Sequence, residues 1–149
     1  MLKDQQARGS ESLDDLKGLN ILLVEDSRAV GDALKGLLEL LGANVAGPAA
    51  TIAAAEALLA HLSPDVAIVD VHLRGGEHSN ALIAGLNERG VPVLVLTGSP
   101  ELPPLPLVGA TAILEKPVSE TALLAHLHPL IARKAARRAA LDAPPAHDS

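Results

Sequence analysis

The sequence contains no cysteine and no phenylalanine, tyrosine or tryptophan. The lack of cysteine excludes disulfide frameworks, thiolate metal sites and cysteine nucleophiles. Without large aromatic residues the core must consist of Leu, Val, Ile and Ala, and nucleic-acid bases find no aromatic side chain to stack on. No apolar run approaches the ~20 residues of a membrane-spanning helix, and the first residues contain no apolar signal core. These absences favour a soluble cytoplasmic protein.

The charge balance is acidic, with 18 Asp and Glu residues, 12 Lys and Arg residues and a formal net charge of -6. This balance argues against a general nucleic-acid binder, because such proteins are usually basic. A length of 149 residues, 48% of them hydrophobic, suffices for one domain with a real core. We predict a disordered segment over residues 1–18, one folded domain over 19–132, and a basic helix end with a disordered tail over 133–149.

Apolar runs that predict strands alternate along the chain with segments of helical spacing. We expect strands at residues 20–24, 44–46, 66–69, 93–96 and 112–114. We expect helices at residues 28–41, 51–62 and 80–89 and from residue 119 onward, with Gly47-Pro48 ending the second strand and Pro129 kinking or dividing the last helix. Five alternations predict an α/β fold, in which helices cover both faces of a parallel sheet.

The stretch between Thr97 and Lys116 contains prolines at positions 100, 103, 104 and 106. Because a regular helix interior does not accept proline, we expect a degenerate fourth helix there, loose or extended with at most one helical turn. Leucines at positions 102, 105 and 107 would cover the sheet edge or form a partner surface, and the sequence does not choose between these roles.

Polar side chains follow the predicted strands where each strand ends. Glu25 and Asp26 follow the first strand, Asp70 the third, Thr97 the fourth and Lys116 the fifth. In open α/β sheets ligands bind outside the carboxyl ends of the strands, so these side chains would converge on one rim. Packed carboxylates repel one another, and a hard cation such as Mg²⁺ relieves that repulsion and can neutralise a transferring phosphoryl group. One carboxylate would then act as the nucleophile and become an aspartyl phosphate.

The segments ILLVEDS, AIVDVHLRGG, VLVLTGS and ILEKP resemble, in this order, the signatures of the response-regulator receiver family over residues 19–131. The resemblance implies a flavodoxin-like, doubly wound, five-stranded parallel sheet of order 2-1-3-4-5. It implies that Asp70 accepts a phosphoryl group from a histidine kinase or phosphotransfer protein in two-component signalling or a phosphorelay. It further implies that Asp26, Asp70 and the backbone carbonyl of His72 bind Mg²⁺ directly, and that Glu25 acts mainly through a metal-bound water.

The same resemblance implies that Lys116 pairs with the phosphoryl group, that Thr97 is the switch hydroxyl and that the Lys116-Pro117 bond is cis. Receivers usually carry Tyr or Phe three residues before this lysine, whereas this chain has Ile113. The usual coupling of hydroxyl movement to aromatic rotation therefore cannot operate as such. The pair Thr97-Gly98 resembles the Thr-Gly of the fourth-strand motif PFxFATGY. This motif is typical of a subgroup of single-domain receivers that is frequent in alphaproteobacteria. The aromatic residues of that motif are absent here.

Two alternative functions remain. A receiver-like protein-binding module that works without phosphorylation is favoured by Ile113 and the proline-rich segment. A phosphatase of the haloacid dehalogenase type would need a second Asp two residues after the nucleophile, but Val71 and His72 follow Asp70. We therefore expect a signalling receiver and not an enzyme, without a DNA-binding output domain. It would be a monomer or weak homodimer that acts on a downstream protein partner, with no nucleic-acid or membrane partner.

Histidines and a basic run leave further alternatives. His72 and His78 would be solvated loop residues or, alternatively, transition-metal ligands or a proton shuttle. The run Arg133, Lys134, Arg137 and Arg138 would form a solvated helix end or bind nucleic acid or an acidic partner.

Overall fold

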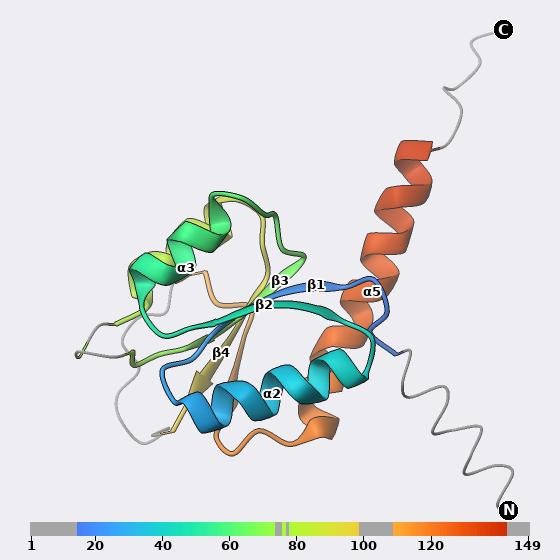
Figure 1. Ribbon diagram of the computed structural model, residues 1–149. Coiled ribbons are helices and arrows are strands. Elements are labelled where there is room, and N and C mark those ends of the chain that lie inside the picture. The colour runs from blue at the N-terminus through green and yellow to red at the C-terminus, as the bar shows by residue number, and fades with distance from the viewer. Residues whose placement is uncertain (1–14, 74–75, 77, 99–108, 143–149) are drawn as a thin grey trace, which may run out of the picture.

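The computed structural model describes residues 15–73, 76, 78–98 and 109–142 (Figure 1). Five strands form one sheet: β1 (Asn20–Val24), β2 (Asn44–Ala49), β3 (Val66–Asp70), β4 (Val93–Thr97) and β5 (Ala112–Glu115). The strand order is β2-β1-β3-β4-β5, and every neighbouring pair is parallel. The predicted flavodoxin-like α/β fold and its strand order are confirmed.

Within the described residues, four helices cover the two faces of the sheet: α2 (Arg28–Leu40), α3 (Ile52–Leu59), α4 (Asn80–Glu88) and α5 (Glu120–Asp142). Alternate residues of each strand enter different cores, because successive side chains of a strand point to opposite faces. Ile21 and Leu23 pack with residues of α2 and α5, whereas Leu22 and Val24 pack with residues of α3 and α4. Figure 1 shows α2 and α3 on opposite sides of the sheet.

Hydroxyl side chains cap three of these helices. Ser27 Oγ accepts from Val30 N at 3.3 Å, Thr51 Oγ1 from Ala54 N at 3.1 Å, and Ser119 Oγ from Ala122 N at 3.0 Å. Each bond satisfies a backbone donor that has no partner within its helix. These caps fix where α2, α3 and α5 begin, and α2 and α5 thereby start beside the carboxyl edge of the sheet.

The prediction that Gly47-Pro48 ends the second strand is wrong, since β2 continues to Ala49. A proline is tolerated because β2 is an edge strand, where a missing backbone donor breaks no ladder on the open side. Gly47 has φ +104°, and a Cβ there would lie 2.4 Å from the carbonyl oxygen of Leu23. Only glycine therefore lets β2 follow β1 this closely, and the extension carries the pairing to Val24 with Ala49.

Other boundaries predicted from the sequence also differ from those in the structure. Pro129 does not divide the last helix, because α5 runs from Glu120 to Asp142 with Pro129 inside it. Leu16, within the expected disordered segment, is fully buried, and its backbone N donates to the carbonyl oxygen of Leu41 at 2.8 Å. Packed structure thus begins before the expected boundary at residue 19, because this leucine fills space beside α2. The rest of the predicted tails, residues 1–14 and 143–149, lies outside the described residues.

The predicted degenerate fourth helix falls mostly on residues 99–108, which lie outside the described residues. The described residues between β4 and β5 form no helix. Among the described helices, none combines the length and the hydropathy that a membrane crossing requires.

Candidate functional site

The carboxyl ends of the parallel strands bring the predicted polar residues to one edge of the sheet. Glu25 follows β1 directly, Asp70 is the last residue of β3, Thr97 is the last residue of β4, and Lys116 follows β5. Their positions follow from strand length and direction, because each strand ends at the same edge. Glu25, Asp70 and Lys116 come into direct contact although 46 and 91 residues separate Lys116 from its two partners.

Lys116 links the two most buried acids of this edge. Its Nζ lies 2.9 Å from Asp70 Oδ2 and 3.0 Å and 3.1 Å from the two carboxylate oxygens of Glu25. The Glu25 side chain is fully buried, and that of Asp70 is 8% exposed. Backbone donors hold both acids as well: Ser27 N reaches Glu25 Oε1 at 3.4 Å, and His72 N reaches Asp70 Oδ1 at 3.3 Å.

The burial of this cluster changes its proton affinities. Desolvation raises the pKa of Glu25, and the charge of Asp70 raises it further against the opposing hydrogen bond from Lys116. Desolvation lowers the pKa of Lys116, but the hydrogen bonds and charges of Asp70 and Glu25 outweigh it, so the pKa of the ammonium is raised above 10.5. Lys116 therefore stays charged at neutral pH, and burial works against the ionised form of Glu25 while Lys116 favours it.

Three carboxylates form a cluster of a size that suits one cation. One carboxylate oxygen each from Glu25, Asp26 and Asp70 lies within 4.8 Å of the others. Glu25 and Asp26 also line a surface pocket of about 290 Å³ beside Pro48. Hard divalent cations prefer carboxylate oxygen ligands of this kind. The single ammonium of Lys116 leaves the three acids with an excess of negative charge, so the donor set fits a divalent cation.

The loop after β3 is anchored by a residue that the sequence reasoning missed. Ser79 is fully buried, and its Oγ donates to the carbonyl oxygen of Val71 at 3.2 Å. This bond holds the backbone next to Asp70, and the signal available in the sequence was a serine directly before the start of α4. His72 and His78 pair in an isolated antiparallel bridge with ring centroids 5.1 Å apart, and both are exposed.

Thr97 and Ile113 occupy neighbouring strands on the other side of the site. Thr97 is partly buried at the end of β4, and its carbonyl oxygen accepts from Lys116 N at 2.7 Å, which fixes the backbone of the lysine. The Lys116-Pro117 bond is cis, as the resemblance implies. Ile113 on β5 is 51% exposed, so the position at which receivers usually carry an aromatic residue presents an aliphatic side chain to solvent.

Comparisons with known proteins agree with this geometry. A family model described as the response regulator receiver domain matches residues 21–128. Comparison with curated protein sequences gives no match. The solved structure of SdrG from Sphingomonas melonis Fr1 is 31% identical, with the alignment covering 76% of this chain and 96% of that chain at a TM-score of 0.65.

Two further structures are similar in fold. The signal receiver domain of an HD domain-containing protein from Pseudomonas fluorescens Pf-5 is 26% identical, with coverage of 80% of this chain and 91% of that chain and a TM-score of 0.68. The PhyR receiver domain from Erythrobacter litoralis is 23% identical, with coverage of 88% and 98% and a TM-score of 0.67.

Proposed function

Because the chain belongs to the response regulator receiver family, a signalling module of two-component systems and not an enzyme, we propose that it accepts a phosphoryl group on Asp70 from a histidine kinase or a phosphotransfer protein. The observation that carries the proposal is the position of the Asp70 carboxylate. It lies within a cation-sized cluster of three acids, and Lys116 Nζ lies 2.9 Å from its Oδ2. Glu25 shares both features, but its side chain is fully buried, whereas that of Asp70 is 8% exposed.

The transfer is a displacement at phosphorus. An Asp70 oxygen attacks the phosphohistidine of the donor, a P–O bond forms, the P–N bond breaks, and the released imidazole takes up a proton. Lys116 and the backbone N of His72 each hold one oxygen of the Asp70 carboxylate, so they orient the nucleophile. The charge of Lys116 also stabilises the added phosphoryl oxygens, and the Thr97 hydroxyl donates to one of them.

We propose that Glu25, Asp26, Asp70 and the carbonyl oxygen of His72 hold Mg²⁺. Bound there, the cation would supply positive charge that offsets the negative charges of the phosphoryl group and the carboxylates. Glu25 would attract the cation through its negative charge from a buried position. Asp26 is less buried and lines the surface pocket from which a donor would approach.

A direct experiment tests this function. The protein is incubated with Mg²⁺ and a small phosphodonor, and its intact mass is measured with and without a chelator. We expect a labile gain of one phosphoryl mass that requires Mg²⁺, persists in Asp65→Asn and is absent from Asp70→Asn. Asp65 is a matched control because it also pairs with a lysine, at 2.8 Å from Lys134 Nζ. The proposal would be refuted if no phosphodonor and no kinase produced this mass gain.

Such a negative result would favour a second function, a protein-binding module that works without phosphorylation. The exposed Ile113 favours it, because a β-branched side chain is restricted at χ1 and offers no aromatic ring to reorient. A partner that binds wild type and Asp70→Asn equally, with loss on Ile113→Ser, would support this module.

A further inference from the structure

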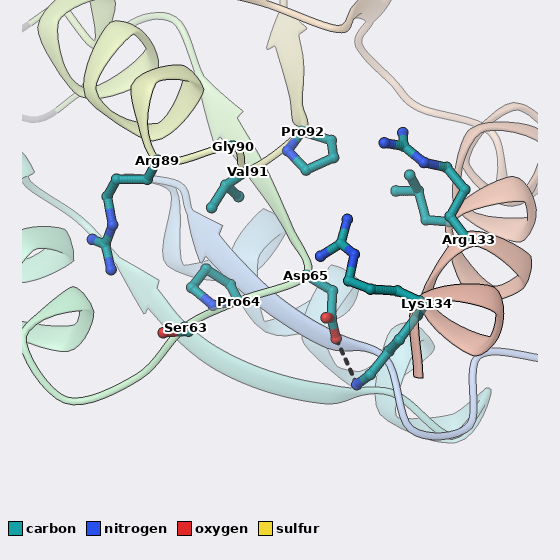
Figure 2. A pocket seen from close by; sticks show the side chains of 11 residues that line it. Ser63, Pro64, Asp65, Arg89, Gly90, Val91, Pro92, Arg133 and Lys134 are labelled. Carbon is teal, nitrogen blue, oxygen red and sulfur yellow. Dashed lines mark hydrogen bonds and ion pairs between the residues drawn. The ribbon is translucent and has the colours of Figure 1, made fainter. Parts of the chain in front are cut away.

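A second pocket lies at the amino ends of the strands, at the edge of the sheet opposite Asp70. It has a volume of about 240 Å³ and is bounded by the segment before β3, the segment before β4 and one face of α5 (Figure 2). The five residues of β3 place roughly 16 Å of strand between this edge and the acidic cluster. We call it the basal pocket, and its chemistry is separate from that of the phosphorylation site.

The basal pocket gathers positive charge. Four of the chain's 12 Lys and Arg residues line it, namely Arg89, Arg133, Lys134 and Arg137, together with a single acid, Asp65. On α5 the lining residues 130, 133, 134 and 137 recur at the spacing of one helix face. In a chain of formal net charge -6, this is a concentrated positive site.

The single acid of the basal pocket is already neutralised. Asp65 Oδ2 lies 2.8 Å from Lys134 Nζ, an ion pair that Figure 2 draws as a dashed line, and it also accepts from Asn20 N at 2.8 Å. Within the described residues, Arg89, Arg133 and Arg137 have no ion-pair partner. Guanidinium groups remain protonated at all physiological pH values, so three uncompensated charges face one pocket.

We propose that the basal pocket binds a small molecule that carries several linked phosphoryl groups. The planar donor fork of arginine matches phosphoryl oxygens. Figure 2 shows Arg89 on one side of the pocket and Arg133 on the other, so a ligand that contacts both must carry anionic groups at more than one point. The walls between them, formed by Pro64, Val91 and Pro92, have little hydrogen-bonding capacity, and the limited volume favours a short ligand over a polymer.

Titration of the full chain with tripolyphosphate, followed by backbone amide chemical shifts and calorimetry, tests the proposal. We expect shifts centred on residues 89–92 and on α5, and orthophosphate should bind at least about tenfold more weakly because it reaches one side only. Arg89→Ala, Arg133→Ala and Arg137→Ala should each weaken tripolyphosphate binding about tenfold. Arg138→Ala is the matched control, since Arg138 follows Arg137 on the same helix but does not line the pocket, and binding should stay within about twofold.

Three results would overturn the proposal: no saturable binding, an equal loss in Arg138→Ala, or tighter binding of a single-stranded oligonucleotide than of tripolyphosphate. Adenosine triphosphate distinguishes the two sources of the ligand. Tighter binding than tripolyphosphate assigns the basal pocket to nucleotides, and equal binding assigns it to the phosphate chain alone. The variants should keep the Asp70 mass gain and the far-ultraviolet circular dichroism of the wild type, which separates this test from that of the proposed function.

Discussion

Two lysine–aspartate ion pairs lie at opposite edges of the same sheet. Lys116 lies 2.9 Å from Asp70 at the carboxyl edge, and Lys134 lies 2.8 Å from Asp65 at the amino edge. The two lysine side chains are similarly exposed, at 25% and 27%. At the amino edge both members of the pair have a further partner, because Asn20 N also donates to Asp65 and Lys134 also donates to the carbonyl oxygen of Gly18.

The carboxyl edge differs in its excess of acid. Lys116 is shared with Glu25, whose side chain is fully buried, and Asp26 adds a third carboxylate nearby. Charges buried with incomplete compensation cost free energy, whereas a partly exposed and fully hydrogen-bonded pair contributes modestly to stability. The amino-edge pair therefore stabilises the packing of chain segments against one another. The carboxyl edge instead retains an energetically unfavourable cluster of charges, which a cation and a phosphoryl group would bind.

Replacing each lysine should give the largest difference in the free energy of unfolding between the two ion pairs. Lys116→Met leaves the buried Glu25 and Asp70 without a counter-charge, and we expect the free energy of unfolding to fall by about 2–3 kcal/mol. Lys134→Met should cost about 1 kcal/mol or less, because Asp65 keeps a backbone donor and partial access to water. Urea unfolding followed by circular dichroism measures both values. Equal losses would contradict the distinction between the two edges.

Neutralising the aspartates should change stability in opposite directions. Asp70→Asn removes a charge that repels Glu25 and leaves Lys116 paired with Glu25, so we expect a gain of up to about 1 kcal/mol. Asp65→Asn weakens the bonds to Asn20 N and Lys134, and we expect a loss of about 1–2 kcal/mol. Thermal unfolding of the two variants at neutral pH gives the comparison. A loss in both variants would show that Asp70 also stabilises the resting fold.

A pH series should sharpen the comparison through Glu25, although its effect is the smallest. Because burial raises the pKa of Glu25 above its ordinary 4.5, the folded protein binds this proton more tightly than the unfolded chain. The contribution of Glu25 to the free energy of unfolding therefore declines as pH rises from 4.5 through the raised pKa. We expect Glu25→Gln to remove this decline, measured as the difference between its unfolding curves and those of the wild type. An unchanged slope would exclude Glu25 as its source.

The titration of Glu25 also predicts how the effect of added Mg²⁺ on the unfolding midpoint depends on pH. Since a cation competes with the Glu25 proton, Mg²⁺ should raise the unfolding midpoint more at neutral pH than near pH 4.5. Asp65→Asn should keep this response and Glu25→Gln should weaken it.

The candidate site could be predicted from sequence because it depends on local signals. Four of the five described strands end in a polar residue or are followed by one, and parallel strands end at one edge, so Asp26, Asp70 and Thr97 follow from strand boundaries alone. The pairing of Lys116 with Glu25 could not be predicted, because 91 residues separate them and the contact depends on how far each side chain reaches. The role of Ser79 was missed for the same reason, since its partner lies in the loop backbone and not in a sequence pattern.

The fold was predicted least well where tertiary contacts override local preference. Gly47-Pro48 has the composition of a turn, yet the sheet edge accepts both residues in strand conformation. Leu16 lies in a polar segment, and only the space beside Leu41 explains its burial. Pro129 lacks one backbone donor, but the rest of α5 keeps its hydrogen bonds and packing through Leu123 and Leu127.

The bond from Lys134 to the carbonyl oxygen of Gly18 has a practical consequence for handling the protein. It ties the first described turn to α5 at the amino edge, so an attachment made directly at residue 15 would lie at the edge of the sheet remote from Asp70. A sensor chip or resin that holds the chain by this end would leave the Asp70 face turned toward the flowing solution. Capture in this orientation would let a kinase in the mobile phase reach the aspartate without obstruction by the support.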